Sequence, residues 1–435
     1  MALTLDLSPY GWTGCSIRED LRGLRSSLPS WRHLPLLRSL PTSSLSMPFS
    51  PFTDASGVRY MPAYKKGVVH NDRGTYSTLY RGGRVVYNCK PSVTTGHVDL
   101  VLKTPLKECA IKEMKLHITP AEDAATPTTR SHSYSDEINA IVYETIIHLL
   151  VCRTLTKAGH PSFVPTFHEI VAVGDAPLDS PTRVKALWSV MEFLKGETLQ
   201  DVCRKRLTMA ATATTPEGRR AIETANEEFL LDAVTQLAYV LYVLQKDLRF
   251  HHRDLKLNNV FCRDTPSTQV VALPTGVTWH CKTDLVLLDF GFSCIACGDE
   301  NPPSPRATLL GAGSWFLSDD ECCKEGRDMA QFLYSLHCHF PLHQYVGTGV
   351  AAFFRSAMTA TTPSGPVDLM NGVTPEGVPL PPGGKPAYHK GIYCFLKRKD
   401  VEVPTLAPLE FLTALSFVEA LGPPQKVEAP RPHGP

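Results

Sequence analysis

The chain has 435 residues, a length that suits one enzyme domain with loop insertions and tails. Its 44 Lys and Arg residues balance 43 Asp and Glu residues, so the sequence lacks the basic excess of proteins that bind nucleic acid or membrane surfaces, and neither partner is expected. Thirteen scattered cysteines without a secretory leader favour a reducing compartment, and the absence of an apolar run of about 18 residues argues against a membrane span.

The N-terminal part divides into two segments of different character. Residues 1–57 are rich in Ser, Pro, Leu and Arg, and their prolines interrupt any helical period, so we predict a flexible extension. Residues 60–115 contain short β-rich pieces separated by Gly and Pro, which is typical of a small antiparallel sheet. This sheet ends in Cys109-Ala110-Ile111-Lys112.

The middle of the chain alternates helical and strand patterns. Apolar residues recur at helical spacing over residues 138–150 and again over residues 230–244, and each pattern predicts an amphipathic helix. Between them, residues 188–196 are interpreted as an apolar strand that leads into a short connector. Residues 119–135 and 207–222 are rich in small polar residues or Ala and are interpreted as insertions.

The most specific stretch follows the second helix, where residues 251–259 read His-His-Arg-Asp-Leu-Lys-Leu-Asn-Asn. An Asp, a Lys two residues later and an Asn five residues later can aim a base, a cation and a metal ligand from one tight loop into one cleft, which suits phosphoryl transfer. The stretch resembles the catalytic loop of protein kinases, H-R-D-L-x-x-x-N. This resemblance implies that Asp254 is the catalytic base, that Lys256 steadies the transferred phosphoryl group and that Asn259 holds Mg²⁺, with His252 and Arg253 as structural support.

Three later segments extend the resemblance. Residues 285–291 form an apolar run that ends in Asp-Phe-Gly, which implies that Asp289 also binds Mg²⁺. Residues 313–319 stand where kinases carry their substrate-docking motif, but they end in Leu-Ser-Asp instead of Ala-Pro-Glu. Residues 328–336 are similar to the helix whose first Asp supports the catalytic loop, a role that falls to Asp328.

The resemblance also gives roles to residues of the N-terminal sheet and the first helix. Cys109-Ala110-Ile111-Lys112 is similar to the kinase strand motif V-A-I-K, which implies that Lys112 binds the phosphates of ATP. The helix over residues 138–150 should then carry a glutamate that orients this lysine. Glu144 is our choice, and Glu137 is the alternative.

The remaining ATP contacts are expected around the connector and in a glycine-rich loop. Met191 would be the gatekeeper at the end of its strand, and the backbone of Glu192 and Leu194 would bond the adenine edge. Gly74 is the central glycine of the loop over the phosphates, although the outer two glycines of the family pattern are missing. The Gly82–Tyr87 segment is a rival for this loop, and either segment taken alone is interpreted as a hairpin turn.

These observations predict an α+β, two-lobed protein-kinase-like fold with a β-rich N-lobe and a mainly helical C-lobe. The N-lobe should cover about 58–191 and the C-lobe about 195–422, and residues 423–435 form a disordered Pro-rich tail. The expected activity is transfer of the γ-phosphoryl group of Mg-ATP to serine or threonine hydroxyls of protein substrates, because the lysine two residues after the catalytic Asp is usual in that class. A pseudokinase scaffold and a small-molecule kinase of the same fold are the alternatives.

The chain combines an intact catalytic-loop motif with degenerate neighbouring motifs. In this combination it resembles divergent kinases of large DNA viruses. This resemblance implies a protein that works in the cytoplasm or nucleus, including those of an infected host cell. The oligomeric state is left open by the sequence.

Overall fold

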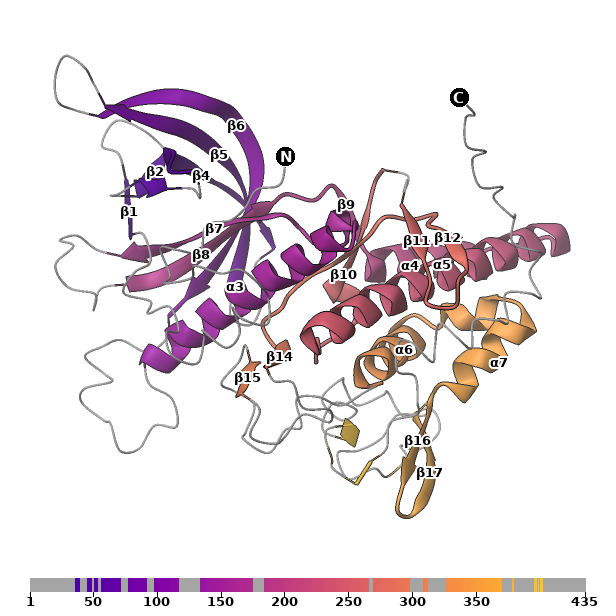
Figure 1. Cartoon of the computed structure of the whole chain (residues 1–435). Coiled ribbons are helices and arrows are strands. Elements are labelled where there is room, and N and C mark those ends of the chain that lie inside the picture. Colours follow the sequence, from indigo (N-terminus) through magenta and orange to yellow (C-terminus); the bar gives the residue numbers. More distant parts are fainter. Residues whose placement is uncertain are drawn as a thin grey trace, which may run out of the picture.

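The computed structural model describes residues 36–39, 45–48, 51–53, 56–71, 77–91, 98–116, 134–174, 184–265, 269–297, 308–311, 326–369, 378, 395–396, 398 and 400–401. Strands dominate the first part of the described chain and helices the second (Figure 1). The expected mixture of helices with an antiparallel sheet is therefore confirmed. None of the helices in these ranges combines the length and the apolar character that a membrane crossing requires.

The largest sheet has eight strands in the order β2-β1-β7-β8-β6-β5-β4-β3. Neighbouring strands run antiparallel, except that β1 and β7 are parallel. The strand bounds are β1 Leu36–Ser39, β2 Ser46–Pro48, β3 Phe52–Thr53, β4 Arg59–Asn71, β5 Ser77–Pro91, β6 Val98–Lys115, β7 Phe167–Gly174 and β8 Val184–Glu192.

The sheet curls back on itself because β2 pairs with β4 as well as with β1. Met47 of β2 is buried against Met61, Ala63 and Val85 of the neighbouring strands. The prediction of a flexible extension over residues 1–57 is therefore wrong for the part that contains β1, β2 and β3. Short strands of this kind have no periodic signal of their own, and only pairing with distant strands defines them.

A buried ion pair crosses the inside of the curled sheet. Arg84 of β5 donates from Nε to Glu169 Oε2 of β7 at 2.9 Å, and a second guanidinium nitrogen contacts the other carboxylate oxygen. Tyr64 of β4 donates to the same carboxylate at 3.1 Å. These bonds satisfy a carboxylate that burial would otherwise destabilise strongly, and they fix the distance between the two walls of the sheet.

Helix α3 (Tyr134–Lys157) packs against this sheet and includes the predicted helix of residues 138–150 (Figure 1). Ile146, Ile147, Leu150 and Val151 are buried together with Met114 of β6 in the main apolar core. The 3₁₀ helix η3 (Pro161–Phe163) then leads into β7. The apolar spacing of the sequence thus located the helix.

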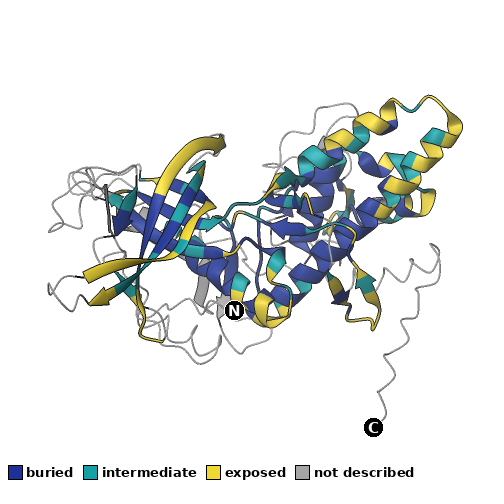
Figure 2. Ribbon diagram, turned by 90° about the horizontal axis from the view of Figure 1, so that it is seen from above, coloured by how far each residue is buried: buried dark blue, intermediate teal, exposed yellow. Residues whose placement is uncertain are grey.

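Helices α4 (Leu199–Ala211) and α5 (Pro216–Leu248) form a hairpin, which corrects the interpretation of residues 207–222 as an insertion. Thr215 caps α5 by accepting the N–H of Gly218 at 3.1 Å, and Pro216 occupies the first helical position. A Thr-Pro pair ahead of a helical stretch is a helix-start signal, so the turn was legible locally. The predicted helix over residues 230–244 is confirmed as the buried half of α5 (Figure 2).

Strands β9 to β13 form two small sheets, and β13 contacts α5. Strand β10 (Val260–Arg263) pairs with β9 (Gly196–Thr198) and with β13 (Leu285–Leu287), and β11 (Val270–Ala272) pairs with β12 (Thr278–His280). The fully buried Asp232 of α5 accepts Trp279 Nε1 at 2.9 Å and the Thr283 N–H at 2.8 Å. This carboxylate therefore anchors the β11–β12 hairpin and the residues after it to α5.

The described part of the C-terminal region contains two more helices and two short hairpins. Helix α6 (Arg327–His339) includes the predicted helix of residues 328–336, and α7 (Thr348–Ser356) follows the 3₁₀ helix η6 (Leu342–Tyr345). The hairpin strands are β14 (Cys294–Cys297), β15 (Thr308–Gly311), β16 (Thr359–Thr362) and β17 (Gly365–Asp368). The predicted tail of residues 423–435 lies outside the described residues.

Candidate functional site

The 251–259 loop starts directly after α5. Arg249 ends the helix in the left-handed conformation, with φ 47°, which turns the chain sharply. His251 then exchanges two backbone hydrogen bonds with Cys294 of β14, each 2.9 Å long. The 3₁₀ helix η5 (Leu257–Asn259) closes the loop and delivers the chain into β10. Both ends of the loop are therefore fixed by regular structure.

The centre of the loop hangs from a buried carboxylate at the start of α6. Asp328 is 2% exposed, and its two oxygens accept the backbone N–H groups of His252 and Arg253, both at 2.8 Å. Arg253 has φ 68°, a conformation that an L-residue adopts only at a cost of order 1 kcal/mol. The two bonds to Asp328 hold this conformation in place, which is the support role expected from the sequence.

Two residues that the sequence analysis missed continue this support. Gln331 accepts the Leu255 N–H at 3.4 Å, and Ser335 accepts the Leu257 N–H at 3.2 Å. Together with Asp328 they lie on one face of α6, at spacings of three and four residues. Their signal in the sequence was the spacing of three and four residues after Asp328, which places polar side chains on one face of a helix. That face is buried in the structure.

Asp254, Lys256 and Asn259 converge as the sequence predicts. Lys256 Nζ lies 2.7 Å from Asp254 Oδ2, and both side chains are partly exposed. Asn259 Nδ2 donates to the backbone carbonyl of Asp254 at 2.8 Å and to Oδ2 at 3.1 Å. The loop therefore presents one carboxylate, one ammonium group and one amide oxygen at the same place.

The Asp289-Phe290-Gly291 turn is tied to this loop by main-chain bonds around Leu288. The Leu288 N–H donates to the Asn259 carbonyl at 2.8 Å, and His252 Nε2 donates to the Leu288 carbonyl at 2.9 Å. Asp289 itself has φ 60°, a second left-handed residue at the site. This backbone geometry turns the Asp289 side chain toward β6.

Lys112 on β6 connects the sheet, α3 and this turn. Its Nζ atom lies 2.5 Å from Glu144 Oε1 and 2.9 Å from Asp289 Oδ1. The structure thus brings Lys112 and Glu144 together as predicted. The side chain of Glu137, the alternative partner, lies outside the described residues, although its backbone belongs to α3.

The three charges of this cluster shift one another's protonation. Burial disfavours the charged form of Lys112, but the carboxylates of Asp289 and Glu144 outweigh it and raise the pKa of Lys112. The positive charge of Lys112 lowers the pKa of Asp289 to about 2. Burial raises the pKa of Glu144, and the nearby Lys112 opposes that shift. At neutral pH the lysine is therefore cationic and Asp289 is anionic.

A stack of four rings runs behind the charged groups. His148 of α3 packs on Phe167 of β7 and on Phe290, with ring centroids 5.4 and 5.0 Å apart, and Phe290 packs on His252 at 5.9 Å. His148 also donates from Nε2 to the Pro165 carbonyl at 2.9 Å. Burial lowers the pKa of His148 to about 4, so the ring is neutral at physiological pH. The stack links the helix of Glu144 to the loop of Asp254 through apolar contact.

The predicted connector follows β8. Met191 is partly buried and pairs with Ala110 of β6, two residues before Lys112, which pairs with Ser189. The Glu192 N–H donates to the Thr166 carbonyl at 2.8 Å, so this donor is already used within the protein. Leu194 lies in the segment between β8 and β9, partly exposed.

The side chain of Glu192 has a structural partner that the sequence analysis did not identify. Arg263 of β10 binds its two oxygens at 2.6 and 3.3 Å, which joins the end of β8 to the strand that follows the 251–259 loop. The Thr166 N–H donates to the same carboxylate at 3.1 Å. Glu192 therefore ties together three segments that are distant in sequence.

Some predicted residues lie outside the described ranges. Gly74 belongs to the connection between β4 and β5, residues 72–76, and residues 313–319 of the expected docking motif are also outside. The rival Gly82–Tyr87 segment is the interior of β5, where Gly82 and Gly83 pair with Cys109 and Glu108 of β6, so its interpretation as a hairpin turn is wrong. A Cβ on Gly82 would come within 2.8 Å of Ile111, which gives a packing reason for this glycine.

Asn259 and Asp289 each keep one oxygen of the kind that a small divalent cation binds. Asn259 donates its hydrogen bonds from Nδ2, and Asp289 accepts its hydrogen bonds at Oδ1. The other oxygens, Asn259 Oδ1 and Asp289 Oδ2, have no hydrogen bonds from the described residues. Mg²⁺ is bound by few protein oxygens, with waters and phosphates completing its shell. Nowhere in the described ranges do three or more His, Cys, Asp or Glu side chains gather as a cluster that could hold a metal by themselves.

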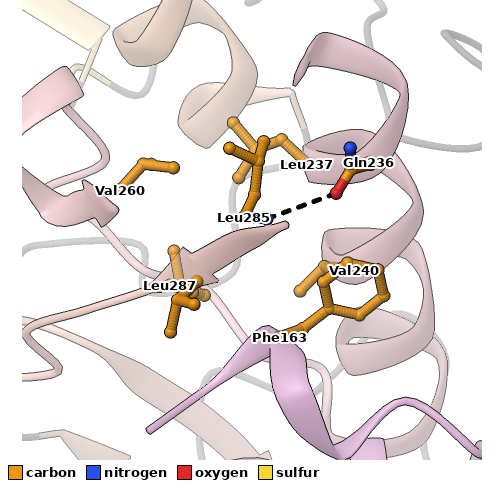
Figure 3. Close-up of a pocket in the computed structure, with 8 residues that line it drawn as sticks. Phe163, Gln236, Leu237, Val240, Val260, Leu285 and Leu287 are labelled. Carbon is orange, nitrogen blue, oxygen red and sulfur yellow. Dashed lines mark hydrogen bonds between the residues drawn. The ribbon is translucent and has the colours of Figure 1, made fainter. Parts of the chain in front are cut away.

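A pocket lies between β13 and α5, next to Phe163 of η3 (Figure 3). Its only polar side chain is Gln236, whose carbonyl accepts the Leu285 N–H at 3.5 Å. The other lining residues are Phe163, Leu237, Val240, Val260, Leu285, Val286 and Leu287. This lining carries no charge for a phosphate, and the pocket is a gap in core packing.

No protein-family model and no curated protein matches this sequence. The functional assignment therefore depends on the residues and the geometry of the site.

Proposed function

We propose that this chain is a serine/threonine protein kinase with a two-lobed kinase-like fold, which transfers the γ-phosphoryl group of Mg-ATP to a hydroxyl group. The observation that carries the proposal is the position of Lys112, which contacts both Glu144 and Asp289. The curled sheet and α3 form the N-lobe in this reading, and the helices from α4 onward form the C-lobe. The segment between β8 and β9 connects them.

The charged groups of the site suit the demands of phosphoryl transfer, which depends on positioning and on neutralisation of phosphate charge. Lys112, oriented by Glu144, would bind the nucleotide phosphates. Asn259 Oδ1 and Asp289 Oδ2 would hold Mg²⁺, which neutralises negative charge on the phosphates when it is bound. Lys256 reaches the same place from the 251–259 loop and would stabilise the phosphoryl group in transit.

Asp254 would orient the acceptor hydroxyl and receive its proton. Its side chain is partly exposed, so a substrate hydroxyl can approach it. Lys256 and Asn259 fix the carboxylate by hydrogen bonds of 2.7 and 3.1 Å, which limits its rotation. General bases that are held in position contribute about 10²- to 10⁴-fold to the rate.

The test is phosphate transfer from radiolabelled Mg-ATP to a generic protein substrate, with Asp254→Asn and Lys112→Met as variants. Asp254→Asn should lower the rate by about 10²-fold or more while nucleotide binding persists. Lys112→Met should weaken nucleotide binding as well. Lys115→Met is the matched control, because Lys115 lies on the same strand and is exposed.

Three results distinguish the candidate functions. Equal incorporation by the wild-type protein and Asp254→Asn would overturn the proposed mechanism. Nucleotide binding without turnover would favour a pseudokinase scaffold. Turnover with a metabolite but not with protein would favour a small-molecule kinase.

A further inference from the structure

Strand β6 has an outer edge that lacks a partner strand over much of its length. On one side β5 pairs with β6 along its whole course from Val98. On the other side β8 pairs with it only from Cys109 to Lys115. Within the described ranges, residues 98–108 therefore have no partner strand on this side and form a sheet edge. Figure 1 shows the distal parts of β5 and β6 curving away from β7 and β8 as an arm.

This edge is apolar on one face. Val98, Leu100 and Leu102 alternate along the strand and are 52%, 45% and 58% exposed. Their cross-strand neighbours on β5 include Cys89 and Tyr87, which border the small buried cluster around Met47. The stripe therefore extends a buried cluster into solvent. A long, exposed, apolar edge strand is a template for pairing with another strand.

The charges on the opposite face of the same stretch are self-complementary. In an antiparallel pairing of two copies centred on Val101, residues whose numbers add to 202 lie opposite each other. Asp99 then faces Lys103 of the second copy, and Lys103 faces its Asp99. On the apolar face, Leu100 meets Leu102 of the second copy twice.

The C-terminal limit of the stretch agrees with this register. Pro105 has no N–H to donate to an added strand, and the pairing of β6 with β5 shifts register between Leu102 and Thr104 and again beyond Thr104, so the paired window ends at Thr104. Val98, the first described residue of β6, lies opposite Thr104 in the same register. The paired window of 98–104 is thus symmetric about Val101.

We propose that two copies of this chain associate through antiparallel pairing of residues 98–104 of β6, which joins their sheets across a two-fold axis at Val101. The partner is a second copy because this sequence supplies its own complementary charges in this register, with Asp99 and Lys103 facing each other twice. Asp99 also faces Lys90 of its own β5, and Lys103 lies over the Tyr60 ring at 5.9 Å. Both groups are exposed and can add a contact to the second copy. The proposal is independent of the proposed enzymatic activity.

Charge reversal tests this register in the full chain by sedimentation velocity over a range of concentrations. Asp99→Lys places Lys opposite Lys103, and Lys103→Asp places Asp opposite Asp99, so each variant should weaken dimerisation about tenfold. An equimolar mixture of the two variants should form heterodimers at wild-type concentrations, because every charged pair is then opposite again. The double variant Asp99→Lys/Lys103→Asp should also dimerise.

The control is Lys107→Glu, an exposed change on the same strand beyond Pro105, which should leave dimerisation unchanged. Recovery in the mixture shows in addition that each single variant is folded. A wild-type chain that stays monomeric at about 100 μM overturns the proposal, since paired interfaces of useful strength form well below that concentration. A dimer that is indifferent to both single changes, or a mixture that does not recover, overturns it too.

Discussion

Replacement of Asp328 should release the 251–259 loop from α6 while the rest of the fold persists. The carboxylate accepts two buried N–H groups at 2.8 Å, from His252 and Arg253, and Arg253 is held at φ 68°. Hydrogen bonds to a charged acceptor contribute about 1.5–3 kcal/mol each, so Asp328→Ala should lower the free energy of opening of this loop by at least about 3 kcal/mol. Asp328→Asn keeps one acceptor and should lose about half as much.

Amide hydrogen exchange of peptides that cover the loop measures this quantity directly. An opening free energy lower by about 3 kcal/mol corresponds to roughly 10²-fold faster exchange, and about 1.5 kcal/mol corresponds to roughly tenfold. The exposed Asp247 of α5 supplies the control, and Asp247→Ala should leave exchange in the loop unchanged. If the loop exchanges in Asp328→Ala as slowly as in the wild type, then Asp328 does not hold it and the interpretation of Arg253 is wrong.

Two further predictions concern buried polar groups outside the charged cluster of Lys112, Glu144 and Asp289. The pKa of His148 is about 4 in the folded chain against about 6.5 when unfolded, so its contribution to stability is present above pH 6.5 and is lost as pH falls toward 4, up to roughly 3 kcal/mol. His148→Gln, which keeps a donor for the Pro165 carbonyl, should flatten the fall of the thermal midpoint over that range; an unchanged slope would exclude His148 as its source. Asp232→Ala leaves the Trp279 Nε1–H and the N–H and hydroxyl of Thr283 without their buried acceptor. It should lower the free energy of unfolding, measured by urea titration, by more than about 4 kcal/mol, whereas Asp247→Ala should change this free energy little. A small effect of Asp232→Ala would mean that water replaces the carboxylate.

The charged cluster and the ring stack together suggest how the two halves of the site stay in register. Glu144 and His148 lie one turn apart on α3, so the helix contacts Lys112 with one side chain and Phe290 with the other. A shift of α3 would disturb both contacts at once. The position of this helix therefore determines whether Lys112 and Phe290 keep their contacts with it at the same time.

The sequence by itself determined the local elements and the chemical identity of the site. Apolar periodicity located α3 and the buried half of α5, because a helix that packs one face on a core must repeat its apolar residues at 3.6-residue spacing. The helix α6 was expected from the resemblance of residues 328–336 to a known helix. The order of residues in the 251–259 loop determined which groups it presents, because a tight loop brings residues two and five positions apart to one place. Lys112 and Asp289 followed from short motifs at strand ends.

Tertiary structure alone decided which distant groups meet. Two glutamates of α3 were candidates for Lys112, and the packing of the helix on β6 brings Glu144 to it at 2.5 Å. The strands before residue 57 join the sheet through partners that are far away in the chain, so their sequence carries no periodic signal. The contact of Glu192 with Arg263 and the packing of His148 on Phe290 also had no signal in the sequence. Contacts between residues far apart in the chain depend on how the elements pack and not on any local pattern.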